Sequence, residues 1–225
     1  MTPATRRLRL GQHHASPQPP QRTGNQSPAG RPAERCDIAD AVSDTAERLA
    51  RFDRTVALHD GTLVRMRPIR SDDAPRLVAL YDHLSRDTRY HRFFSVMQRL
   101  PPDWARFLAT VDYRSRLALV VESPDDADTL IAVARYEPTA ESGTAEVAFV
   151  VQDGWQDRGL GTVLFSELLA VAELNGIRRF RAWVLADNRR MLDLIARLGE
   201  VSQRSIDQGV VELSFTARPA RSSGS

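Results

Sequence analysis

The stretch 150–162 passes directly from an apolar, strand-like run into a helix through a turn that contains Gly159 and Gly161. After the turn, apolar residues recur at helical spacing, at Leu160, Val163, Leu164, Leu168 and Val171. A helix N-terminus presents unpaired backbone N–H groups and partial positive charge, so it can bind a diphosphate. The turn therefore predicts a phosphate-binding site, with an ordinary glycine-containing turn as the alternative.

The spacing of this turn disfavours two common nucleotide sites. A P-loop ends in Gly-Lys-Ser/Thr, and this turn has no such ending. A dinucleotide-binding turn lies in a parallel βαβ unit, with an acidic residue farther along the chain. We therefore expect neither ATP nor NAD at this turn.

Hydrophobic periodicity predicts strands and helices after residue 60. The expected strands are 63–69, 117–122, 129–136, 144–151, 180–185, 201–206 and 210–215. The expected helices begin near residues 71, 101, 159 and 188. Three consecutive strands are joined by short polar links, whereas later strands are joined through helices. We therefore expect an α/β (α+β) fold with a mixed, mostly antiparallel sheet of six to seven strands, flanked by about four helices.

Residues 59–217 are expected to form one domain, because a chain of 225 residues buries a single sizeable core. Residues 1–35 are rich in Pro, Gln, Gly, Ser and Arg and show no sustained hydrophobic period, so we expect a disordered tail. Residues 36–58 are expected to form a short amphipathic lead-in. Residues 218–225 are expected to be a disordered C-terminus.

Composition argues against several classes of partner. The formal net charge is only +2, so we expect no nucleic-acid partner. No apolar run approaches the roughly 20 residues of a membrane span and no secretory signal is recognisable, so we expect a cytoplasmic protein with no membrane partner. Cys36 is the single cysteine, so we expect neither disulfides nor a metal site. All 31 basic residues are arginine, so the sequence offers no lysine amine of its own.

The pattern Gln156-x-x-Gly159-x-Gly161 after a strand, in this order of elements, resembles the acetyl-CoA loop of the GNAT superfamily of N-acetyltransferases. The resemblance extends over about residues 61–216 and implies a GNAT fold with acetyl-CoA as co-substrate. In that family the strand before the turn splays from its neighbour and binds pantetheine, and amides of the turn hold the pyrophosphate. The implied cofactor-binding residues are Phe149, Val150, Val151, Gln156, Asp157, Arg158, Gly159, Leu160, Gly161, Thr162 and Asn188.

Asn188 has a second interpretation. It heads the helix expected from residue 188, so it is also a candidate helix cap, with Asp187 as the rival cap. Both roles, pantetheine contact and cap, can coexist.

Transfer of an acetyl group to an amine needs a neutral nitrogen, whereas a free lysine side chain is protonated at neutral pH. A base must therefore remove that proton. Glu146 lies three residues ahead of Phe149 in the strand before the turn, so its carboxylate is the candidate catalytic base, acting directly or through water. The alternative is an exposed strand carboxylate, and Glu141 and Glu122 are weaker candidates.

Many GNAT enzymes carry a tyrosine on the last helix that protonates the leaving thiolate. The matching position here is Ile195. This departure leaves protonation of the thiolate to water or to an unidentified group. CoA can leave as a thiolate without a dedicated acid, because the pKa of a thiol lies not far above neutrality.

A second group of matches lies in the acceptor half: Asp60-Gly61-Thr62, Arg67-Pro68-Ile69-Arg70, Leu84-Ser85 and Arg89-Tyr90-His91-Arg92-Phe93-Phe94. It resembles the bacterial Pat-type protein lysine acetyltransferases, which modify the active-site lysine of acyl-CoA synthetases, and Glu146 matches their catalytic glutamate. The resemblance implies a protein acceptor such as an acyl-CoA synthetase. The alternatives are a GNAT enzyme acting on a small amine and a catalytically silent acyl-CoA-binding module. For residues 89–94, aromatic packing at a helix end is the alternative.

Overall fold

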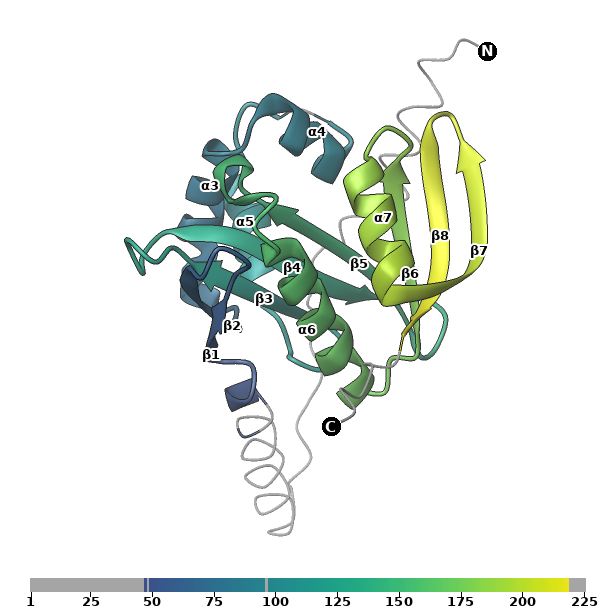
Figure 1. Cartoon of the computed structure of the whole chain (residues 1–225), viewed down its shortest axis with the longest axis horizontal. Coiled ribbons are helices and arrows are strands. Elements are labelled where there is room, and N and C mark those ends of the chain that lie inside the picture. The colour runs from purple at the N-terminus through teal and green to yellow at the C-terminus, as the bar shows by residue number, and fades with distance from the viewer. Residues whose placement is uncertain (1–46, 48, 96, 219–225) are drawn as a thin grey trace, which may run out of the picture. The chain divides into compact units, whose positions relative to one another are not determined.

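An eight-stranded sheet forms the centre of the part of the chain that the structure, a computed structural model, describes: residue 47 and residues 49–95 and 97–218 (Figure 1). Its strands are β1 (Arg54–Ala57), β2 (Leu63–Pro68), β3 (Leu117–Glu122), β4 (Leu130–Pro138), β5 (Thr144–Val151), β6 (Arg179–Leu185), β7 (Gly199–Asp207) and β8 (Val210–Ala217). They lie in the order β1-β2-β3-β4-β5-β6-β8-β7. Neighbouring strands are antiparallel except β5 and β6, which are parallel.

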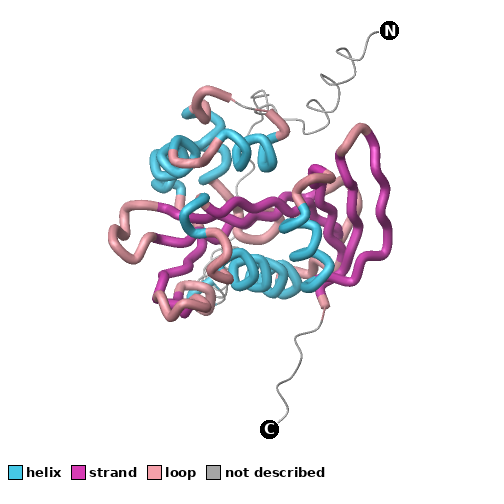
Figure 2. The backbone as a smooth tube through the Cα atoms, turned by 45° about the horizontal axis from the view of Figure 1, so that its top comes forward, coloured by secondary structure: helices cyan, strands magenta, loops and turns pink. Residues whose placement is uncertain are grey.

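Helices cover both faces of this sheet (Figure 2). The α-helices are α3 (Ala74–Asp82), α4 (Arg86–Phe93), α5 (Pro102–Ala109), α6 (Leu160–Leu174) and α7 (Arg189–Leu198), and the short 3-10 turns are η1 (Ser71–Asp73) and η2 (Asp153–Trp155). The helices α3, α4 and α5 lie on one face, and α6 and α7 lie on the other. The sheet is therefore the middle of three layers.

The mixed, mostly antiparallel sheet expected from the sequence is confirmed, with eight strands rather than six to seven. Strand β1 was not expected, because its four residues, RTVA, form an edge strand with mostly exposed side chains. Helix α4 was not expected as a separate helix, because its sequence, RDTRYHRF, lacks an apolar stripe. The expected tail 1–35 lies outside the described residues, as do residues 36–46 of the lead-in and residues 219–225.

Side chains that alternate along the strands fill two separate cores. Val147 and Val151 of β5 belong to the core that α6 and α7 cover, together with Leu164 of α6. Val150 faces the opposite way and belongs to the core beneath α3 and α5, together with Leu77 of α3. Residues of β5 that are an odd number of positions apart therefore face different helical layers.

A buried ion-pair network joins the layer of α3 to the sheet. Arg67 of β2 donates to both oxygens of Asp73, at 2.7 and 2.8 Å, and to Glu122 of β3, at 2.5 Å. Burial opposes ionisation of Asp73, but the hydrogen bonds from Arg67 and the Arg70 backbone outweigh it, so the pKa of Asp73 is lowered. Glu122, one of the weaker candidates for the base, is thus part of the structural core.

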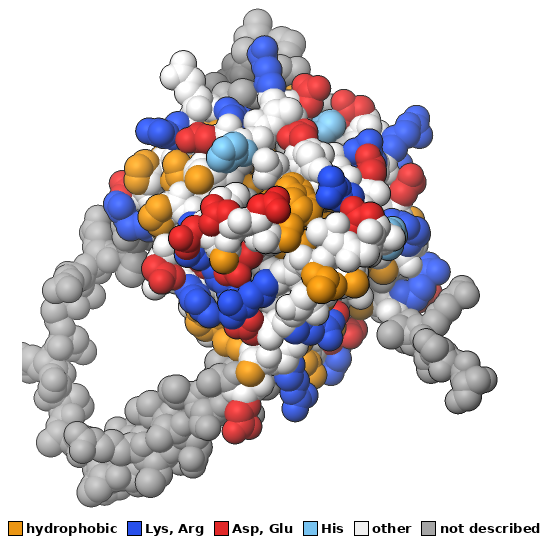
Figure 3. Space-filling model, turned by 60° about the vertical axis from the view of Figure 1, so that its left-hand side comes forward, with side chains coloured by type: hydrophobic (Ala, Val, Ile, Leu, Met, Phe, Trp, Pro, Cys, Tyr) orange, Lys and Arg blue, Asp and Glu red, His pale blue; other side chains and the backbone are white. Residues whose placement is uncertain are grey.

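Acidic and basic side chains are intermingled on the face shown in Figure 3. Surface ion pairs of the described residues include Arg65 with Asp53, at 2.9 Å, and Arg54 with Glu167, at 2.5 Å. Each such exposed pair contributes about 0–1 kcal/mol to the free energy of unfolding, so these pairs add little to the stability of the fold. Within the described part of the chain, no helix combines the length and the apolar character needed to cross a bilayer.

Candidate active site

The parallel strands β5 and β6 pair over three residues only and then separate. Their ladder joins Thr144–Glu146 to Arg179–Arg181. Beyond Glu146, β5 continues against β4 as far as Val151, while β6 continues against β8 as far as Leu185. The sheet therefore opens at the carboxyl ends of its two parallel strands, which is where α/β sheets bind ligands. The resemblance to GNAT enzymes predicts such a separation ahead of the glycine turn.

The opening has two different sides. Phe149 belongs to the side of α6 and α7, and its ring lies 5.4 Å from that of Phe165 of α6. Glu146 is three residues earlier, so its side chain points to the side of α3, α4 and α5. The sequence predicts Glu146 and Phe149 near one cleft. The structure brings them to the same opening but on opposite faces of the sheet.

The turn that follows β5 and η2 has a left-handed backbone at two residues. Asp157 has φ 62°, and Gly159, which directly precedes α6, has φ 84°. The positive φ of Gly159 favours glycine. A Cβ built there would also lie 2.6–2.7 Å from the imidazole of His59, so that exposed side chain would have to move. The backbone N–H of His59 also donates to the carbonyl of Arg158, at 3.1 Å, which holds the turn against the β1–β2 link.

The first turn of α6 presents the candidate phosphate donors. The backbone N–H of Thr162 donates to the carbonyl of Gly159 at 3.0 Å, so the N–H groups of Leu160 and Gly161 are the better candidates. A Cβ on Gly161 would face Phe149 and Val151 of β5 and Leu194 of α7, at 3.6–4.0 Å. The glycine thus leaves room between β5 and α7, beside the opening.

Gln156 fixes the turn to its surroundings. Its side-chain nitrogen donates to the carbonyl of Val151 at 3.0 Å, and its oxygen accepts from Arg190 of α7 at 2.8 Å. Arg190 also pairs with Asp157, at 2.9 Å. A cation in the first turn of a helix is unfavourable with the helix dipole, so Arg190 is placed for these contacts rather than for α7.

Asn188 caps α7. Its side-chain oxygen accepts from the backbone N–H of Met191 at 3.2 Å, so the capping role considered in the sequence analysis is present. The carboxylate of the rival Asp187 lies instead 3.4 Å from the imidazole of His91 of α4. The side-chain amide nitrogen of Asn188 is the group suited to donate to a pantetheine carbonyl.

Glu146 lies in a cluster of charges under α4. Its cross-strand partner is Glu137 of β4, which accepts from Arg116 at 2.5 Å and from Arg135 at 2.9 Å. The pKa of the Arg92 guanidinium, on α4, is lowered to about 10 by burial and by Arg135, while the charges of Glu146 and Glu137 act in the opposite direction. Arg92 therefore stays protonated at neutral pH, close enough to the candidate base for the charge of Glu146 to act on its pKa.

Glu141 lies in the link between β4 and β5. It pairs with Arg179 and Arg181 of β6, at 2.6 and 2.8 Å. These are the residues of β6 that still pair with β5, so Glu141 reinforces the closed end of the opening. Glu141, a weaker candidate for the base, is thus engaged in ion pairs that stabilise the sheet.

Residues 64–201 match the family model of the acetyltransferase (GNAT) domain. This chain belongs to the GNAT family of acetyltransferases. The expectation of an N-acetyltransferase with a GNAT fold is confirmed, and so is the expected similarity to Pat proteins.

Three relatives show how far the similarity extends. Acetyltransferase PA5475 of Pseudomonas aeruginosa is 34% identical over 152 residues, which cover 67% of this chain and 82% of that protein. Acetyltransferase Pat of Mycolicibacterium smegmatis is 36% identical over 178 residues, 77% of this chain, and the chain spans 52% of its length. The crystal structure of the GNAT domain of S. lividans PAT has a TM-score of 0.67 and 37% identity, and the match covers 74% of this chain and 98% of that one.

Ile195, at the place where many GNAT enzymes have a tyrosine, is completely buried in the core beneath α7. Neighbouring Leu194 is also buried. This position therefore contributes packing, and protonation of the leaving thiolate must come from elsewhere. Among the described residues, no group of three or more His, Cys, Asp and Glu side chains is arranged to hold a metal ion.

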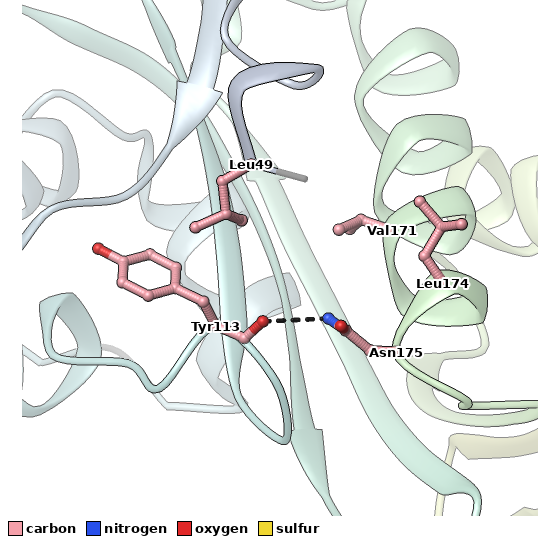
Figure 4. Close-up of a pocket in the computed structure, with 5 residues that line it drawn as sticks. All are labelled: Leu49, Tyr113, Val171, Leu174 and Asn175. Atoms are coloured by element: carbon pink, nitrogen blue, oxygen red, sulfur yellow. Dashed lines mark hydrogen bonds between the residues drawn. The ribbon is translucent and has the colours of Figure 1, made fainter. Parts of the chain in front are cut away.

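A shallow pocket at the other end of α6 is separate from this site (Figure 4). It is lined by Leu49, Tyr113, Val171, Leu174 and Asn175, and the Asn175 side-chain amide donates to the Tyr113 carbonyl at 3.1 Å. Helix α6 has 15 residues and so is about 22 Å long, which puts this pocket far from the glycine turn. We assign it no role in the reaction.

Sequence reasoning missed the arginines that surround the site. Arg190 had one available signal, its position in the first turn of a predicted helix. Arg92 lies in the group of matches at residues 89–94, but the sequence did not link it to Glu146. Arg116 and Arg135 had no signal, because they approach Glu137 from segments that are not recognisable as part of the site in the sequence.

Proposed function

We propose that this GNAT protein transfers the acetyl group of acetyl-CoA to the side-chain amine of a lysine in another protein, with Glu146 as the base. The observation that carries the proposal is the separation of β5 from β6 directly after Glu146. This opening has the glycine turn and Phe149 on one side and Glu146 on the other. Donor and acceptor can thus meet in the opening from opposite faces of the sheet.

The donor side is supported by the geometry of the turn. We assign the pyrophosphate to the backbone of Asp157, Arg158, Gly159, Leu160, Gly161 and Thr162, with Gln156 holding the turn in place. The helix N-terminus, the left-handed Gly159 and the space beside Gly161 suit a diphosphate and a narrow pantetheine chain. We assign the pantetheine to the open edge of Phe149, Val150 and Val151 and to Asn188.

The chemistry needs one proton acceptor on the acceptor side. Glu146 takes a proton from the lysine ammonium, directly or through water, and the neutral nitrogen then attacks the thioester carbonyl carbon. A C–N bond forms, the C–S bond breaks, and CoA leaves as a thiolate that takes a proton from water. The positive charges of Arg92 and Arg135 attract the carboxylate of Glu146, which is the form that accepts a proton.

A protein acceptor is favoured by the Pat relatives and by the charges around Glu146. The two carboxylates Glu137 and Glu146 are accompanied by three arginines, so the acceptor side lacks the excess of acid that would select a polyamine or another small cationic amine. An acyl-CoA synthetase is the acceptor we would offer first. The buried Ile195 supports a second candidate, a catalytically silent acyl-CoA-binding module.

The test follows CoA release from acetyl-CoA, with an acyl-CoA synthetase and a panel of small amines offered separately. Wild type and Glu146→Gln are compared. Because the 225 residues contain no lysine, any acetyl-lysine detected on a blot comes from the acceptor. CoA release with acetyl-lysine on the synthetase, lost in Glu146→Gln, supports the proposal.

Two other outcomes contradict it. Release with a small amine alone would move the assignment to a small-molecule acetyltransferase. Saturable binding of acetyl-CoA without release from any acceptor would leave the silent module.

A further inference from the structure

Helix α4 is poorly supported by its own sequence. It has eight residues, Arg86–Phe93, and none of them is fully buried. Isolated helices shorter than roughly 12 residues are marginal in water. The last residue of α4, Phe93, packs on the core, with its ring centroid 5.3 Å from that of Tyr81 and 5.8 Å from that of Trp104. The N-terminal end of α4 has no such apolar anchor, so its position depends on polar contacts.

Asp153 holds the N-terminal end of α4. Its carboxylate accepts from the backbone N–H and the hydroxyl of Ser85, at 2.8 and 2.7 Å, and from the hydroxyl of Thr88, at 2.7 Å. Ser85 is the N-cap of α4 and accepts from the backbone N–H of Thr88, at 3.1 Å. Burial opposes ionisation of Asp153, but these hydrogen bonds outweigh it and lower its pKa, so the contacts are charge-assisted at neutral pH.

Asp153 is also the start of the path into the glycine turn. It is the second residue after β5 and lies three residues ahead of Gln156. The side chain of Gln156 touches both the Val151 carbonyl, at 3.0 Å, and the Thr88 hydroxyl, at 3.5 Å. Asp153 and Gln156 therefore attach the N-terminal end of α4 to the turn that we assign to acetyl-CoA.

The other end of α4 reaches the opposite side of the opening. The imidazole of His91 lies 3.4 Å from the carboxylate of Asp187, which is the second residue after β6. Helix α4 thus runs from the end of β5 to the end of β6, across the mouth of the gap between these strands (Figure 1). At the same end of α4, the guanidinium of Arg92 lies over the ring of Phe93, 4.9 Å from its centroid, and within the electrostatic reach of Glu146.

We propose that Asp153 is a positioning residue that couples the acetyl-CoA turn to α4, so that donor binding orders α4 and brings Arg92 into place beside Glu146. The proposal rests on the proposed function for the identity of the donor. It predicts a binding order in which acetyl-CoA prepares the acceptor side. Asp153 itself touches neither substrate.

Hydrogen exchange in the full chain tests the coupling without any acceptor. In wild type, saturating acetyl-CoA is expected to slow the exchange of residues 86–93. In Asp153→Ala, these amides are expected to exchange about tenfold faster before acetyl-CoA is added, and acetyl-CoA is expected to protect them no more than twofold. Asp103→Asn is the matched control, because Asp103 is an exposed carboxylate in the first turn of the equally short α5 and lies outside the site.

Thr88→Val is a second variant that removes the contact from the side of α4. It is expected to reproduce part of the effect, which keeps the test decisive if Asp153→Ala unfolds. Unchanged exchange of residues 86–93 in both variants, or full protection by acetyl-CoA in Asp153→Ala, would overturn the proposal.

Kinetics separate positioning from a general loss of stability. With an acyl-CoA synthetase as acceptor, Asp153→Asn is expected to raise KM for the acceptor about tenfold, while the Kd for acetyl-CoA stays within about twofold of wild type. A rise in the Kd for acetyl-CoA alone would contradict the coupling. If wild type acetylates no acceptor, the proposed function fails, whereas the exchange of residues 86–93 still decides the role of Asp153.

Discussion

Glu137 and Glu146 are direct cross-strand partners in the ladder between β4 and β5, with both side chains on the face covered by α4 and α5. Two carboxylates in this relationship repel each other. Arg116 and Arg135 hydrogen-bond to Glu137, and Arg92 lies within the electrostatic reach of both acids. The two glutamates therefore have different tasks: Glu137 organises the arginines, and Glu146 is the carboxylate beside the opening of the sheet.

Glu146→Gln is expected to reduce kcat by about 10²–10⁴, because the lysine ammonium loses its proton acceptor. Its melting temperature should change little, because the relief of the repulsion with Glu137 is offset by the loss of the attraction to Arg92 and Arg135. Glu137→Gln should instead lower the free energy of unfolding by about 1–3 kcal/mol, because Arg116 and Arg135 lose their carboxylate. Steady-state kinetics and thermal unfolding of both variants check this, and loss of chemistry in Glu137→Gln but not in Glu146→Gln would refute the assignment.

Gly159→Ala should cost about 1–2 kcal/mol of stability, because alanine is strained at φ 84° and its Cβ would meet the imidazole of His59. Affinity for acetyl-CoA should fall about tenfold as the turn shifts. Gly154→Ala is the matched control, since Gly154 lies in the preceding 3-10 turn and a Cβ there has no atom within 4 Å. Thermal unfolding and acetyl-CoA titration measure both effects. Equal behaviour of the two variants would argue against a special role for Gly159.

Arg92→Gln should move the acid limb of the pH profile of kcat/KM to higher pH. The cause is the loss of a positive charge that favours the ionised form of Glu146. Arg86→Gln, an exposed arginine on the same helix, should leave the acid limb in place. Rates measured between pH 5 and pH 9 at fixed ionic strength give the answer. An unmoved limb in Arg92→Gln would mean that Arg92 does not act on the base.

Asp73→Asn should destabilise the fold by about 3–5 kcal/mol at neutral pH, because Arg67 would keep its charge in the core without a full partner. The native pKa of Asp73 lies below its ordinary value of 3.8, so its contribution is complete above that value. That contribution is lost as the pH falls through the lower native pKa. Wild type should therefore lose stability below about pH 4 more steeply than Asp73→Asn does. Melting temperatures from pH 7 to pH 3 test this, with exposed Asp72→Asn as the control.

Local patterns were sufficient for much of the fold. The glycine turn between β5 and α6, the strands of the ladder from β3 to β5 and the apolar stripe of α6 depend on residues close in sequence, so periodicity and helix-end signals reveal them. Strand β1 and helix α4 were not predicted from the sequence, because both are short and polar. Contacts with other elements stabilise them, rather than the intrinsic propensity of their residues.

The features of the candidate site likewise divide into those that local sequence predicts and those that only the tertiary structure reveals. The sequence alone determined the order of the elements other than β1 and α4, the glycine turn and the presence of a carboxylate at residue 146, because these follow from local pattern. Only the tertiary structure decided that β5 parts from β6 after Glu146, that Glu137 faces Glu146 and that α4 is tied to Asp153. Each of these joins residues that are distant along the chain, and strand register and charge compensation between such residues are set by packing of the whole sheet.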